Sequence, residues 1–116
     1  MGRTVDLSIL KEMVGDDPEI IQEMLEIFCQ DVPQYMDAIQ QGELANDWAA
    51  IANAAHTLKS TVGFTGRKDL VQLAEKLQYQ KTVPEDPVYF DLLKQFKTEI
   101  LSVLQEVKEM VDNKEF

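Results

Sequence analysis

Apolar side chains recur along most of the chain at steps of three and four residues. This is the spacing of one face of an α-helix, whereas a half-buried strand would alternate every second residue. The pattern predicts a short first helix after Asp6, whose carboxylate is expected to act as the N-cap. Asp17 and Pro18 then begin a long helix, with Asp17 as the N-cap and Pro18 at the first helical position. Pro33 lies inside this helix and is expected to kink or break it, because proline lacks the N–H that the helical hydrogen bond needs.

Three further helices are expected in the rest of the chain. Asn46 or Asp47 is expected to cap the third helix, which ends near Gly63. A loop over residues 82–87 precedes the last helix, and the Asp86-Pro87 pair in it repeats the start signal of the second helix. The positions expected to face inward are Ile20, Ile21, Met24, Leu25, Phe28, Val32, Tyr35, Met36 and Ile39, then Trp48, Ile51, Ala55, Leu58 and Val62, then Leu70, Leu73, Ala74 and Leu77, and finally Phe90, Leu93, Phe96, Ile100, Leu104, Val107 and Val111. This organisation predicts an all-α fold, an antiparallel four-helix bundle with a short additional N-terminal helix laid across it, as a single domain over residues 1–116.

The charge balance narrows the expected partners. The chain has 21 acidic and 11 basic residues and a net charge of −10, which argues against nucleic-acid binding because that needs a positive surface. The charge is uneven, since residues 56–81 carry a net charge of +3 between two acidic flanks, and this segment begins at His56, the only histidine. No apolar run reaches the roughly 18 residues of a membrane span, and no signal-like stretch opens the chain, so we expect a cytoplasmic protein that does not bind membranes.

The motifs of common enzyme classes are missing from the sequence. There is no Gly-rich phosphate loop, no Gly-x-Gly-x-x-Gly and no Gly-x-Ser-x-Gly. One histidine and one cysteine cannot build a His/Cys metal cluster, so no metal site is expected. Cys29 falls in an apolar helical run and is interpreted as a buried structural residue. The sequence thus offers no motif for binding ATP.

Helical geometry turns His56 away from the core. At about 100° per residue, His56 lies roughly 130° from the inward stripe of its helix, so its imidazole is expected to face solvent. The residues on its own side of the helix are small, namely Ala49, Ala52, Ser60 and Gly63. Lys59, one turn further on, places an ammonium group beside the ring. The alternative interpretation is a structural histidine on a helix whose small residues pack against a neighbouring helix.

The segment from Ala55 to Gly66 carries a specific resemblance to a known family. It reads Ala-His-Thr-Leu-Lys-Ser-Thr-Val-Gly-Phe-Thr-Gly and resembles the signature of histidine phosphotransfer (HPt) domains, which is Ala-His-x-Leu-Lys-Gly with a second Gly ten positions after the His. One departure is Ser60, which stands where the family most often has Gly. Its small hydroxyl group can still hydrogen-bond a phosphoryl oxygen. The helices on both sides are also similar in spacing, so the resemblance covers nearly the whole chain.

The resemblance implies a role in a multistep phosphorelay of two-component signalling. His56 would accept a phosphoryl group from an aspartate of one receiver domain and pass it to another receiver, without ATP-dependent kinase activity of its own. It implies that Lys59 stabilises the phosphoryl oxygens and that Gln78 orients the histidine ring. The residues expected to dock the receiver are Ala52, Ser60, Gly63, Arg67 and Lys68. The receiver would supply Mg²⁺, so this chain is expected to bind no cofactor, and we expect it to act as a monomer.

Each assignment has a plainer alternative. Lys59 can be a solvated lysine whose stem covers apolar surface, Gln78 an exposed glutamine without a role, and Gly66 an ordinary helix terminator. For the chain as a whole, the alternative is a non-catalytic helical interaction module in which His56 is unused. Exposure to a phosphorylated receiver domain discriminates between the two functions.

Overall fold

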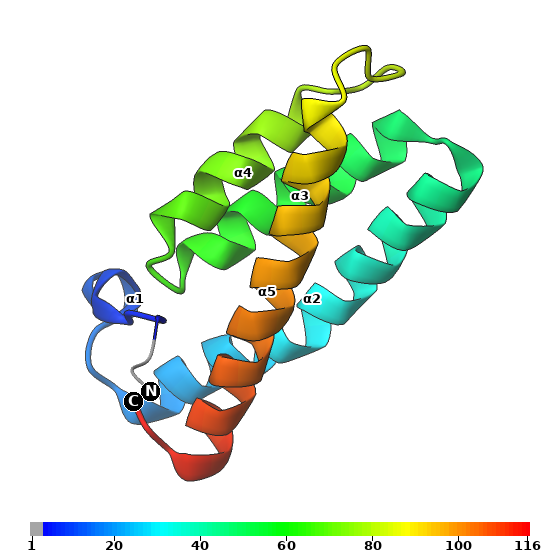
Figure 1. Cartoon of the computed structure of the whole chain (residues 1–116). Coiled ribbons are helices and arrows are strands. Elements are labelled where there is room, and N and C mark those ends of the chain that lie inside the picture. The colour runs from blue at the N-terminus through cyan, green and yellow to red at the C-terminus, as the bar shows by residue number, and fades with distance from the viewer. Residues whose placement is uncertain (1–3) are drawn as a thin grey trace.

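The computed structural model describes residues 4–116, which form five α-helices. These are α1 (Ser8–Val14), α2 (Pro18–Ala45), α3 (Trp48–Gly63), α4 (Lys68–Gln78) and α5 (Val88–Asn113). Figure 1 shows that α2 to α5 run alternately up and down as an antiparallel bundle. α3 packs against α2 and α4, and α5 packs against the same two helices. The described residues contain no strand, so the all-α prediction is confirmed.

Aspartate side chains cap α2 and α3 as the sequence predicts, whereas Pro87 and not Asp86 occupies the N-cap position of α5. The carboxylate of Asp17 accepts a hydrogen bond from the backbone N–H two residues on (3.0 Å), and Pro18 is the first residue of α2. Asp47 caps α3 by accepting from the N–H three residues on (3.0 Å). Asn46 instead ends α2 with a left-handed backbone conformation (φ 54°). Asn46 therefore ends α2 and Asp47 begins α3 within one tight turn.

The long helix α2 continues through Pro33 without a break. Pro33 is exposed, while its neighbour Val32 and, one turn earlier, Phe28 are almost wholly buried. Ile39, after the proline, is also fully buried, so apolar contacts hold the helix on both sides of Pro33. They outweigh the single backbone hydrogen bond that proline cannot make.

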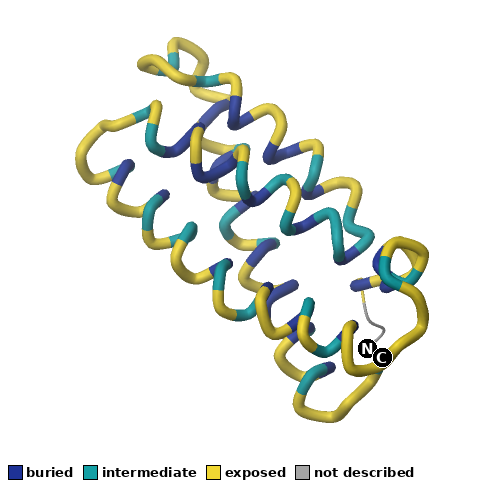
Figure 2. Tube along the Cα trace, turned by 180° about the vertical axis from the view of Figure 1, so that it is seen from behind, coloured by how far each residue is buried: buried dark blue, intermediate teal, exposed yellow. Residues whose placement is uncertain are grey.

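Most of the bundle core consists of the predicted inward positions, but the prediction missed the buried residues Ala52, Ala54, Tyr89, Val103 and Met110. Figure 2 shows buried segments along all four long helices. Two predicted positions are exposed instead, because each lies in the first turn of its helix beside the residue that does point inward. Ile20 is 40% exposed next to the buried Ile21. Phe90 is 49% exposed next to the buried Tyr89, and its ring packs edge-on against Trp48 with centroids 6.0 Å apart.

The N-terminal segment covers one end of the α3–α4 hairpin. These two helices are much shorter than α2 and α5, and α1 lies near the turn that joins them (Figure 1). The backbone N–H of Asp6 donates to the carbonyl of Thr65 in that turn (2.8 Å). Asp6 accepts from the N–H of Ser8, where α1 begins, although Leu7 occupies the N-cap position. Leu7 and Leu10 are buried, so this segment completes the core.

None of the helices in the described part of the chain is both long and apolar enough to cross a membrane.

Replacing Gly66 with alanine is predicted to destabilise the fold by roughly 1–3 kcal/mol. Gly66 has a φ of 73°, and a Cβ there would lie 2.6 Å from the backbone carbonyl oxygen of Asp6. Urea denaturation followed by circular dichroism measures the loss. Gly63→Ala is the matched control, because a Cβ at Gly63 meets nothing within 4 Å. Equal unfolding midpoints for the two variants would contradict this role of the turn.

Candidate functional site

His56 lies in the middle of α3 and is exposed. Its neighbour Ala55 and, half a turn later, Leu58 are fully buried. The burial of that face of α3 against the bundle turns His56 outward, as the helical periodicity predicts. The imidazole is therefore accessible to a partner.

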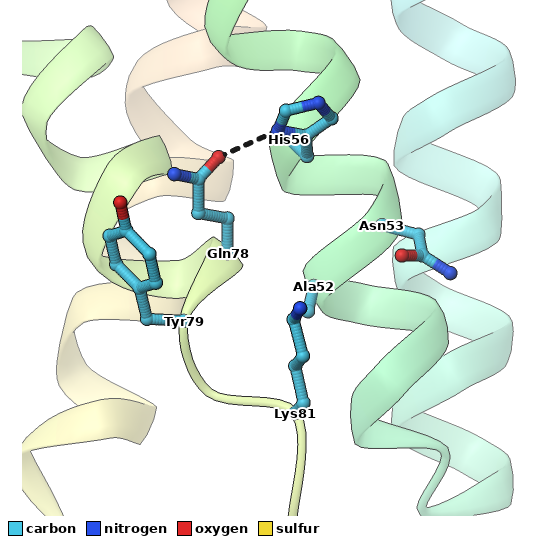
Figure 3. A pocket seen from close by; sticks show the side chains of 6 residues that line it. All are labelled: Ala52, Asn53, His56, Gln78, Tyr79 and Lys81. Atoms are coloured by element: carbon cyan, nitrogen blue, oxygen red, sulfur yellow. Dashed lines mark hydrogen bonds between the residues drawn. The ribbon is translucent and has the colours of Figure 1, made fainter.

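A hydrogen bond fixes the orientation of the ring. His56 Nδ1 lies 2.9 Å from Gln78 Oε1, across the hairpin formed by α3 and α4 (Figure 3). Gln78 is the last residue of α4 and is 9% exposed. Its backbone position follows from Leu77 and Ala74, which are fully buried in the core. Gln78 is thus neither freely exposed nor without a contact.

This hydrogen bond also decides which ring nitrogen is nucleophilic. An amide oxygen can only accept a hydrogen bond, so Nδ1 of His56 carries the proton that it donates to Gln78. In a neutral imidazole the lone pair then lies on Nε2. Nε2 stands on the edge of the ring that the hydrogen bond to Gln78 leaves free (Figure 3). The arrangement presents a basic nitrogen to whatever approaches α3.

A hollow of about 320 Å³ lies beside the ring. It is lined by Ala52, Asn53, His56, Gln78, Tyr79 and Lys81 (Figure 3). Ala52 is only 2% exposed. The expectation that it forms part of an open surface needs correction, because the residues of α4 and the loop after it rise beside α3 and leave the Ala52 methyl group at the bottom of the hollow.

The family model that describes the Hpt domain matches residues 23–113, most of the chain and all of α3 and α4. The chain belongs to the HPt domain family. Searches of curated proteins and of solved structures return no significant match. HPt domains are phosphocarriers in histidine phosphotransfer rather than kinases. The exposed histidine of this HPt domain is His56.

Several predicted docking residues lie around the histidine of the HPt domain. Lys59 is half-buried and Ser60 is exposed, both on α3 within the next turn after His56. Gly63, at the end of α3, leaves open space where a side chain would stand. Lys68 is exposed at the start of α4, next to the turn rather than beside the ring. The structure thus brings Lys59 and Ser60 near His56 and leaves Lys68 at the end of the hairpin.

Arg67 does not provide a free positive charge, so its expected place on the docking rim needs correction. Its guanidinium donates to the carboxylates of Asp69 and Glu99 and to the hydroxyl of Thr4. The side chain is only 14% exposed. Its hydrogen bonds hold the pKa of the Asp69 carboxyl below its usual range. Arg67 thus joins the N-terminal segment to α4 and α5.

Sequence reasoning missed three residues of the hollow, which are Asn53, Tyr79 and Lys81. Asn53 precedes His56 by three residues and so lies on the same side of α3, a signal that helical spacing could have provided. Tyr79 and Lys81 follow the end of α4, where no periodicity applies. Their place depends on how the loop after α4 runs beside α3.

The described residues contain no group of three or more histidine, cysteine, aspartate or glutamate side chains that could hold a metal ion.

Cys29, interpreted from the sequence as buried, is half-buried, and burial raises the pKa of its thiol.

Removing the acceptor at Gln78 is predicted to abolish the preference for the Nδ1-protonated ring. We expect Gln78→Leu to keep its helical circular dichroism, because leucine fills the same partly apolar site and His56 can bond to water instead. Long-range ¹H–¹⁵N NMR measures the tautomer directly, since His56 is the only histidine.

Gln80→Leu is the control, because the Gln80 amide bonds only to the carbonyl of Thr82 in the loop. An Nδ1-protonated ring that persists in Gln78→Leu would show that another group sets the tautomer.

Proposed function

We propose that His56 accepts a phosphoryl group from the aspartyl phosphate of one receiver domain and passes it to an aspartate of another receiver. The observation that carries the proposal is the exposed imidazole whose Nδ1 is bound by Gln78. The HPt family supports phosphotransfer in general. The assignment to His56 and to two receivers rests on the site geometry and on the resemblance of residues 55–66.

The chemistry needs few groups from this chain. Nε2 of His56 attacks phosphorus in line, the N–P bond forms, and the bond from phosphorus to the aspartate oxygen breaks, so the carboxylate leaves with the bonding electrons. The proton on Nδ1 stays in its hydrogen bond to Gln78 and stabilises the positive charge that develops on the ring. The reverse reaction on a second receiver carboxylate restores the neutral imidazole.

Phosphoryl transfer depends mainly on positioning and on stabilising charge. The receiver supplies Mg²⁺ and its own acidic pocket, and this chain contributes no cofactor. Lys59, one turn after His56, makes no ion pair with another residue in 4–116 and supplies a positive charge beside the phosphoryl oxygens. Phosphate enters and leaves only through receivers, and the chain acts as a cytoplasmic monomer that displays one nucleophile.

The charge distribution suits a receiver as partner. The chain as a whole carries −10, whereas residues 56–81 carry +3 and include His56 and Gln78. A local positive region in an acidic protein attracts an acidic partner to one face and repels it elsewhere. This steering favours encounters that place the receiver aspartate near the histidine.

His56→Gln is predicted to fold normally and to accept no phosphate. Its side chain is exposed, so no core contact is lost. The test incubates the wild type and the variant with receiver domains that have been phosphorylated with ³²P-labelled acetyl phosphate and Mg²⁺. The wild type should gain acid-labile, base-stable label.

The same label in His56→Gln would overturn the assignment of the site. A wild type that takes label from none of the receiver domains of its organism would leave the chain as a helical interaction module.

Lys59→Ala is predicted to slow the transfer by about tenfold or more, because one positive charge at the phosphoryl oxygens is lost. Rapid-quench measurement at saturating receiver gives the transfer rate. Lys94→Ala on α5, an exposed lysine outside the hollow, is the control and should match the wild type. A wild-type rate in Lys59→Ala would remove Lys59 from the mechanism.

A further inference from the structure

The hollow beside His56 is larger than phosphate transfer alone requires. The reacting nitrogen is Nε2, on the edge of the ring away from Gln78, so the incoming phosphoryl group needs no space between α3 and the loop after α4. Yet a space of about 320 Å³ opens there, on the side of the ring toward the start of α3. Ala52 lies at its bottom, one helical turn before His56.

Two of the six residues that line the hollow, Ala52 and Tyr79, offer apolar surface to an inserted side chain. The bottom is the methyl group of Ala52, and one wall is Tyr79, whose side chain is 70% exposed although it is large and aromatic. Asn53, on α3, also lines the hollow. An aromatic ring left this exposed beside a concave surface is typical of a contact residue in a protein interface.

The rim carries an unused positive charge. Lys81 is exposed, lines the hollow, and makes no ion pair with any other residue of the described chain. In Figure 3 its ammonium group lies beside Ala52, whereas the ring of His56 extends from the other end of the hollow. Lys81 therefore keeps its charge available to a partner, in contrast to Arg67, whose charge is neutralised by Asp69 and Glu99.

We propose that the hollow is a specificity site, in which a receiver domain inserts an apolar side chain above Ala52 while Lys81 pairs with a carboxylate next to it. This inference rests on the proposed phosphotransfer function and deepens it by naming what selects the receiver. The occupant follows from charge complementarity, since an acidic receiver meets the +3 segment, and from continuity with the face that displays His56. Receivers that lack the apolar side chain or the carboxylate are poor substrates.

Two variants with matched controls test the site. Ala52→Met fills the hollow, and Ala45→Met adds the same side chain to an exposed position at the end of α2 outside it. Lys81→Glu reverses the charge on the rim, and Lys76→Glu reverses an exposed charge on α4 that does not line the hollow. The substrate is the receiver domain that phosphorylates the wild type fastest, after phosphorylation with acetyl phosphate and Mg²⁺.

We expect each hollow variant to raise the KM for the phosphorylated receiver by roughly fivefold or more. In Lys81→Glu, kcat should stay within about twofold, because His56, Gln78 and Lys59 are unchanged. The effect of Lys81→Glu should shrink as salt is added, whereas that of Ala52→Met should not. Both controls should match the wild type.

Three results would overturn the proposal. One is a wild-type KM in both hollow variants. Another is a loss confined to kcat, which would place Lys81 in the chemistry instead. The third is an equal loss in Ala45→Met and Ala52→Met, which would show that the loss is not specific to the hollow. A wild type that accepts no phosphate at all is a different outcome, because it refutes the proposed function itself.

Discussion

The hydrogen bond between Nδ1 of His56 and Oε1 of Gln78 joins the chemistry of this chain to its fold. Each partner belongs to a different helix, so the bond exists only while α3 and α4 keep their register. That register is held by packing between the two helices and by the turn that contains Gly66, whose φ of 73° and close approach to Asp6 leave no room for a side chain. A reactive nitrogen at the surface thus depends on the tight packing beneath it.

The bundle separates two tasks between its two faces. α2 and α5 are long and supply about half of the buried apolar side chains, whereas α3 and α4 form a shorter hairpin that displays the histidine. The N-terminal segment covers the turn of that hairpin, and Arg67 fastens it to α4 and α5 through Asp69 and Glu99. Supporting the hairpin in this way keeps the site rigid. Rigidity favours phosphoryl transfer because the barrier is lowered mainly by positioning.

The positively charged side chains also divide between those that stabilise the fold and those that remain available at the site. Arg67 is bound within the fold, while Lys59 and Lys81, on either side of His56 in the site, make no ion pair with other described residues. Paired charges stabilise the protein locally, whereas unpaired charges remain available to an incoming partner. In a chain with a net charge of −10, two such lysines give a partner one preferred side of approach.

The sequence by itself determined the helices, most of the core and the exposure of His56. Those features follow from the 3.6-residue helical period, from aspartate caps such as Asp17 and Asp47, and from the apolar stripe of each helix, which can be recognised without knowing the neighbouring helices. It also carried the family signature between Ala55 and Gly66. Local patterns failed where two helices or a loop had to meet. They predicted a free charge at Arg67 and an open surface at Ala52. Of the two outcomes expected at Pro33, a break is excluded because the helix is continuous there.

Only the tertiary structure decided which nitrogen of His56 is free, where the hollow lies and which lysine stands at its rim. Gln78 is 22 residues from His56, and Lys81 follows the end of α4. Their distances from the ring depend on how α4 and its loop pack against α3. No spacing along one helix contains that information, because it arises from contacts between segments that are far apart in the chain.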